Sequence, residues 1–172
     1  MRSCVLMAAV LLALSTTLGC ASDPSDGWAM GGGFQDDVKT IAVPVWDNQT
    51  FVPGLGAELT EALISEIQRT TPWLVVSSGA NTTLTGVIRA SDLRKLSTDN
   101  TTGLVQELAV DLAVDFEWRT IRGREPLVAR TDFRSQASFI PTNGIGEPIE
   151  VGQRGAVEAM ARDIVSELRS DW

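Results

Sequence analysis

The feature that most constrains the fold of this chain is a strict alternation between residues 104 and 119, LVQELAVDLAVDFEWR. Every second residue from Leu108 to Trp118 is apolar, and charged residues such as Glu107, Asp111 and Asp115 lie between them. A period of two is typical of a β-strand with one apolar and one polar face, whereas a helix would spread these carboxylates around its circumference. The alternation therefore predicts a long strand whose apolar face must be covered by the rest of the chain.

Six further segments are predicted from apolar periodicity and from Gly, Pro and Asn-rich turns between them. Pro44 in the first segment favours an edge position or a bulge there. The two helical segments are amphipathic, and each has a single apolar face. The segments are strand 38–46, helix 53–70, strand 73–76, strand 83–96, strand 127–139 and helix 151–170. With strand 104–119 the order is β-α-β-β-β-β-α, which predicts an α+β fold with two helices packed on one face of a mixed sheet.

Charges on the polar face of this sheet should be complementary. The acidic residues of strand 104–119 have Arg89 before them and Arg130 and Arg134 after them. Cross-strand ion pairs of this kind stabilise a register by roughly 0.2–1 kcal/mol each. On strand 127–139 the apolar face is expected to carry five residues. They are Leu127, Ala129, Phe133, Ala137 and Phe139.

The helices are too short to cover the long hairpin formed by residues 83–119. A helix of about 18 residues is ~27 Å long, whereas a strand of about 14 residues spans ~45 Å. The alternation is strict only from Glu107 onward, so the uncovered end is expected at the turn, from Arg94 to Gln106.

The N-terminal segment has the composition of a secretory signal. Arg2 precedes an apolar run from Val5 to Leu14, which is too short to span a bilayer permanently, and small residues follow. The sequence Thr17-Leu18-Gly19-Cys20 resembles the lipobox of bacterial lipoproteins, which implies that Cys20 becomes an acylated first residue. The predicted organisation is a signal peptide at 1–19, a lipidated Cys20 with a flexible tether at 20–37, and an α/β domain at 38–172.

Composition and charge exclude several functions. The formal charge is −8, or −9 once Arg2 is removed with the signal, so a nucleic-acid partner is not expected. The chain contains no His, which excludes a Ser-His or Cys-His nucleophile pair and any His-containing zinc site. Asp111 and Asp115 are ~13 Å apart by strand rise, too far for a glycosidase pair. We therefore expect no enzymatic activity, no metal and no cofactor.

Several strand and helix motifs resemble the LptE family of lipopolysaccharide-assembly lipoproteins. They are KTIAVPVWDNQTF (39–51), GL (54–55), LTEAL (59–63), LTGVI (84–88) and ARDIV (161–165). The resemblance implies a lipid-anchored outer-membrane protein on the periplasmic side, which plugs and helps to assemble the LptD β-barrel for lipopolysaccharide transport to the outer leaflet.

Two residues near the projecting turn, Arg94 and Lys95, are the candidates for contact with lipid A phosphates. The alternative that these two charges only keep the turn soluble stays open. The strand reading IAV before an Asn-Gln-Thr-Phe turn and a helix also resembles periplasmic lipoproteins of the CsgG and LpoB kind. That second resemblance implies a role in secretion or in the activation of a peptidoglycan synthase. A structural lipoprotein without a transport role is a third possibility.

Overall fold

The computed structural model describes residues 38–101, 103–141 and 149–170, which belong to one compact unit. The predicted signal peptide, Cys20 and the predicted tether lie outside the described residues. The described elements follow the predicted order, except that the first strand is in two pieces. They are β1 (Thr40–Ala42), β2 (Asp47–Asn48), α2 (Leu55–Thr70), β3 (Leu74–Val75), β4 (Thr82–Thr98), β5 (Val105–Thr120), β6 (Pro126–Phe139) and α3 (Ile149–Arg169).

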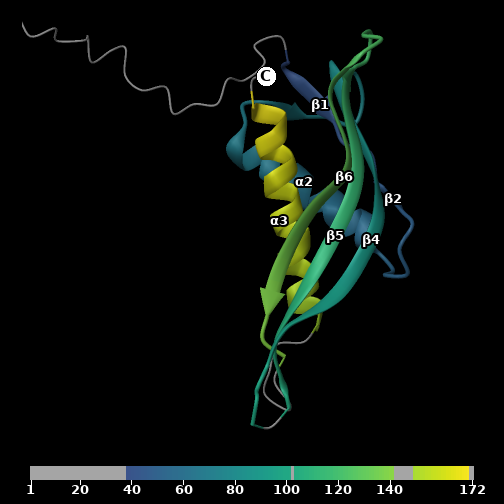
Figure 1. Ribbon diagram of the computed structural model, residues 1–172. Helices are drawn as coiled ribbons and strands as arrows, with labels where there is room; N and C mark the ends of the chain where they lie inside the picture. Colours follow the sequence, from purple (N-terminus) through teal and green to yellow (C-terminus); the bar gives the residue numbers. More distant parts are fainter. Residues whose placement is uncertain (1–37, 102, 142–148, 171–172) are drawn as a thin grey trace, which may run out of the picture. The chain divides into compact units, whose positions relative to one another are not determined.

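The six strands form one mixed sheet, in which β3, β1, β4, β5 and β6 are neighbours in that order and β2 also pairs with β4. The pairs of β1 and β2 are parallel, whereas β4, β5 and β6 form an antiparallel meander. Both helices lie on the same face of the sheet, with α3 along β5 and β6 and α2 packed against α3 (Figure 1). The α+β architecture predicted from the sequence is confirmed.

The core lies between the helices and the apolar face of β5. Val110, Leu112, Val114, Phe116 and Trp118 are all buried, as the alternation predicted. Burial of a large apolar side chain stabilises a fold by about 1.5–3 kcal/mol, so the buried face of β5 contributes strongly to the stability of the domain. The helices supply the opposing side chains: Leu55, Leu59, Leu63 and Ile67 from α2, and Ala156, Val157, Met160, Ala161, Ile164, Val165 and Leu168 from α3.

Residues 43–46 interrupt the first predicted strand. β1 is an interior strand between β3 and β4, so the expectation of an edge position at Pro44 was wrong for β1 itself. Pro44 lies instead in the break before β2, where a missing N–H costs no ladder hydrogen bond. After this break, Trp46 is buried in the core, where its indole ring packs against Gly86. A Cβ on Gly86 would be 2.4 Å from Cζ3 of Trp46.

The apolar face predicted for β6 was wrong at Ala129, whereas Leu127 is partly buried and packs against the core. Val128 and Arg130 lie opposite Trp118 and Phe116 on the helix side of the sheet, whereas Ala129 lies opposite Glu117 on the polar side. The phase changes at Asp132, whose φ of 52° is in the left-handed region and which lies at a register irregularity between Val114 and Phe116. A bulge of this kind adds one residue to a strand and moves every later side chain to the other face.

A second bulge occurs on β4 at Arg89. Ile88 lies opposite Val114 and Ala90 opposite Ala113, so Arg89 has no directly opposite residue on β5. From this point the faces of β4 are exchanged relative to a regular strand. The change determines which way the residues near the hairpin turn are directed.

Candidate functional site

The part of the chain that the structure describes holds no cluster of His, Cys, Asp or Glu that could bind a metal ion. Neither described helix is long and apolar enough to cross a membrane. The surface features that could bind a ligand or a partner are instead the polar face of the sheet and the two ends of its strands. Each is built from residues of several elements.

The polar face of β5 carries ion pairs with both neighbouring strands. Arg89 Nε donates to Asp115 Oδ2 at 2.7 Å, and the backbone N–H of Asp132 donates to Asp115 Oδ1 at 2.9 Å. The Asp132 hydrogen bond and the Arg89 guanidinium hold the pKa of Asp115 below its usual range. Both bulges thus meet at one carboxylate, and the cross-strand pair expected for Arg89 is present.

The pair expected for Arg130 was wrong, and Arg134 lies on the expected polar face, opposite Ala113, but forms its ion pair within its own strand. Because of the β6 bulge, Arg130 is on the helix face, where its Nη2 is 2.5 Å from Glu167 of α3. Arg134 pairs with Asp132 of its own strand at 2.9 Å, and that neighbour raises the pKa of Arg134. Sequence spacing could not show either pairing, since both depend on the position of the bulge.

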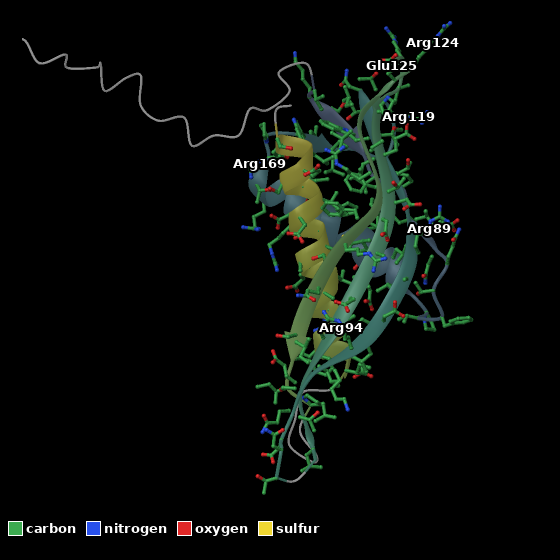
Figure 2. The ribbon with its side chains drawn as sticks, in the orientation of Figure 1. Arg89, Arg94, Arg119, Arg124, Glu125 and Arg169 are labelled. Atoms are coloured by element: carbon green, nitrogen blue, oxygen red, sulfur yellow. The ribbon has the colours of Figure 1, made fainter. Side chains whose placement is uncertain are left out.

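The candidate residue Arg94 belongs to the same polar face. Its Nε donates to Asp111 Oδ2 at 2.8 Å, and its Nη2 donates to Gln136 Oε1 at 2.7 Å. The hydrogen bond with Asp111 raises the pKa of Arg94 and lowers the pKa of Asp111. Figure 2 shows Arg94 along the strands, between the hairpin turn and the middle of the sheet. Part of its donor capacity is therefore already used within the sheet.

The candidate residue Lys95 is on the opposite face. It lies across from Leu108, on the side of the sheet that the helices cover elsewhere. Its side chain is exposed, and it forms no ion pair with any residue that the structure describes. The structure thus separates the two candidates, because directly opposite residues share a face and neighbours along a strand do not.

A group of exposed apolar residues lies at the same end of the sheet as Lys95, which we call the hairpin end. Phe139 at the end of β6 lies opposite Leu108 and against Gly152 of α3, so the β4–β5 hairpin, β6 and the start of α3 meet here. The members of the group are Leu93, Leu96, Leu104, Ile140, Ile149 and Val151, with exposures from 39% to 59%. Sequence reasoning predicted the uncovered turn but missed this group, because its members come from four separate segments.

The hairpin end therefore combines exposed aliphatic side chains with an unpaired ammonium group. Aliphatic surface of this kind is a feature of interaction sites, and the ammonium adds a donor for an anion. Such a surface suits a ligand with apolar chains and anionic groups. Cys20, the other residue predicted to be functional, lies outside the described residues.

The sequence matches the family model described as LptE, Lipopolysaccharide-assembly, over residues 38–172. No curated protein matches the chain at a significant level. The match includes all of the elements described above.

Three solved structures share the fold at low sequence identity. A protein from Xanthomonas campestris gives a TM-score of 0.52 at 10% identity over 74% of this chain and 81% of its own. A hypothetical protein from Chlamydia trachomatis gives 0.51 at 11% identity over 77% and 96%. A minor lipoprotein from Acinetobacter baumannii gives 0.50 at 15% identity over 77% and 93%. These similarities establish the fold that the chain shares with them.

Proposed function

The chain belongs to the LptE lipopolysaccharide-assembly family, and on that basis we propose that it is an outer-membrane lipoprotein that plugs and helps to assemble an LptD-type β-barrel. The observation that carries the proposal is the family match over the whole domain, residues 38–172. In this role the protein is anchored through acylated Cys20 on the periplasmic side, and it binds and positions lipopolysaccharide without catalysing a reaction.

The polar face of the sheet supports a role inside a water-filled barrel. Its charges are largely paired within the sheet, as in Arg89 with Asp115 and Arg94 with Asp111. Paired charges of this kind remain hydrated at the surface and contribute little net stability, so the face can meet a polar lumen with little loss of solvation. Ala109 and Ala113 lie on the same face of β5 as these ion pairs. Both are buried and have short side chains, so no long side chain projects from these two positions.

The hairpin end supports contact with lipopolysaccharide. Lys95 provides a donor for a lipid A phosphate, and the exposed leucines at the same end of the sheet provide an apolar surface for acyl chains. Arg94 would contact phosphate from the other side of the strand, with the guanidinium nitrogens that Asp111 and Gln136 leave available. The two residues would then hold a phosphate-rich headgroup around the edge of β4 rather than on one face.

Affinity purification from outer membranes tests the proposal. The chain, extracted in mild detergent, should copurify in a stable complex with a large β-barrel protein and with bound lipopolysaccharide. Recovery of ring-shaped oligomers of the chain without a barrel would contradict it and would favour the CsgG-like role. Recovery with a peptidoglycan synthase would favour the LpoB-like role.

A further inference from the structure

The end of the sheet opposite the hairpin end is basic, although the chain as a whole has a formal charge of −8. This basic end consists of Lys39 before β1, Arg119 at the end of β5, and Arg122 and Arg124 in the turn before β6. Figure 2 shows Arg119 and Arg124 together at this end, far along the strands from Arg94. A basic patch in an acidic protein is a local feature, and overall charge would not reveal it.

The hydrogen bonds at this end place its parts together. The backbone N–H of Leu74 donates to the carbonyl of Lys39 at 3.0 Å, and the N–H of Ile121 donates to the carbonyl of Asn81 at 2.9 Å. The N–H of Asn81 in turn donates to Thr40 Oγ1 at 2.7 Å. Residues before β1, before β4 and after β5 therefore form one continuous surface.

Most of the positive charge here is not neutralised by neighbours. Within the described part of the chain, Lys39, Arg122 and Arg124 take part in no ion pair, whereas Arg119 pairs with Glu117. All four basic side chains are exposed. Glu125 is the only acidic residue in the turn 121–125, and Glu117 pairs with Arg119, so the described residues of the basic end carry an excess of positive charge.

Apolar side chains accompany these charges. Ile121 is 58% exposed and Leu74 is 63% exposed. Ile121 also lines a cavity of about 630 Å³, whose other lining residues are apolar, basic and polar: Val38, Gly79, Ala80, Leu127, Arg122, Asn81, Thr82 and Thr120. Basic side chains next to exposed aliphatic ones are the composition of a surface that sits at the level of lipid headgroups.

We propose that the basic end docks on the anionic surface of a lipid bilayer. The position of Val38 supports a bilayer as the partner. Val38 lies at the basic end and is only 18 residues after Cys20 in the sequence. This supporting argument rests on the proposed lipid anchor at Cys20. Docking would orient the domain with its basic end at the leaflet that holds the anchor and its hairpin end directed away from that leaflet.

Vesicle binding of the mature-length chain with Cys20→Ser tests the docking without any acyl chain. The vesicles contain phosphatidylcholine alone, or two parts phosphatidylcholine to one part phosphatidylglycerol. We expect binding to the anionic vesicles only, with weaker binding as salt rises and screens the charges. Equal binding to both vesicle types, or binding to neither, would overturn the proposal.

The double variant Arg122→Gln/Arg124→Gln should weaken binding to anionic vesicles by about 25-fold, since each basic residue near such a surface contributes roughly a five-fold factor. The matched control is Arg154→Gln/Arg162→Gln, which makes the same charge change on exposed positions of α3 and should change binding less than two-fold. Equal losses in the two double variants would show a general charge effect and overturn the docking surface.

A conservative double variant, Arg122→Lys/Arg124→Lys, should retain binding, because a charged bilayer responds to charge and not to guanidinium geometry. Loss of binding in this variant, with an unchanged melting temperature, would point to a specific phosphate site and would also overturn the bilayer docking. The vesicle assay needs neither acylation nor a barrel partner. Its failure therefore leaves the proposed function intact, and failure to copurify a barrel leaves the docking result intact.

Discussion

Gly152 of α3 lies directly against the ring of Phe139 at the end of β6, and a Cβ on Gly152 would be 2.2 Å from Cδ1 of that ring. One turn further along the same helix, a Cβ on Gly155 would be 3.4 Å from the Cβ of Ala137, an ordinary van der Waals distance. The absence of a side chain at Gly152 is therefore what lets the start of α3 approach the sheet beside the hairpin end.

Alanine substitution of these two glycines should have opposite effects. Gly152→Ala should lower the free energy of unfolding by about 1–3 kcal/mol, because the ring of Phe139 must move to admit the methyl group. Gly155→Ala should raise it by about 0.5–1 kcal/mol, because alanine is favoured over glycine in a helix interior. Urea denaturation of both variants gives the measurement. A loss of stability in both would contradict the geometry at Gly155.

Thr60 joins α2 to the segment before β2 through one buried hydroxyl. The Oγ1 atom accepts from the backbone N–H of Trp46 at 3.0 Å and donates to the carbonyl of Gly56 at 2.7 Å. Thr60→Val should lower the free energy of unfolding by about 1–3 kcal/mol, because the Trp46 N–H is left buried without a partner. Thr60→Ser keeps the hydroxyl and should cost clearly less. If Thr60→Ser costs as much as Thr60→Val, the hydrogen bond would not be the dominant contribution of this side chain.

Asp115 should make stability depend on pH. Its pKa in the folded protein is lowered by the Asp132 hydrogen bond and by Arg89, below an unfolded value of about 3.9. A lowered folded pKa contributes stability that is present above the unfolded pKa and is lost as pH falls through the folded pKa. The stability difference between wild type and Asp115→Asn should therefore be largest at neutral pH and shrink below about pH 4.

Urea titrations between neutral and acidic pH measure this difference. The neutral substitution Thr85→Ala, on the same sheet face, should show a constant difference from wild type at every pH. A constant difference for Asp115→Asn as well would contradict the lowered pKa.

The two candidate residues of the hairpin end should differ in their effects on lipopolysaccharide binding. Lys95→Gln should weaken binding by roughly five-fold, the factor expected for one basic residue at an anionic lipid, without changing the melting temperature. Arg94→Gln should weaken it less, because Arg94 already bonds Asp111 and Gln136. Titration of purified lipopolysaccharide into each variant gives the affinities, with Arg162→Gln, at an exposed position further along α3, as the control. Unchanged affinity in both variants would remove these residues from the proposed site.

The predicted lipidation gives a test in cells. Cys20→Ser should leave the chain uncleaved or soluble in the periplasm, because the acyl chains that hold it at the membrane would be missing. Fractionation followed by immunodetection measures the distribution, with Cys4→Ser as the matched control, since Cys4 lies inside the predicted signal. Membrane association unchanged from wild type would refute the lipobox assignment.

The resemblance of five short motifs to the LptE family was confirmed, although those motifs are strand and helix patterns without a catalytic signature. The uncovered turn was also predictable, because it follows from the difference between strand rise and helix rise. Which of the neighbours Arg94 and Lys95 lies on the polar face was not predictable, since it depends on the β4 bulge at Arg89.

The alternation from Leu108 to Trp118 by itself determined a strand, its buried face and the need for other elements to cover that face. This was possible because a period of two is a local property that any strand must express on its two faces. The phase of β4 and β6 was decided only by the tertiary structure. The bulges at Arg89 and Asp132 depend on pairing with β5 across the sheet. The same antiparallel pairing brought the exposed leucines to one end and Arg122 and Arg124 to the other, because register joins residues that are distant in sequence.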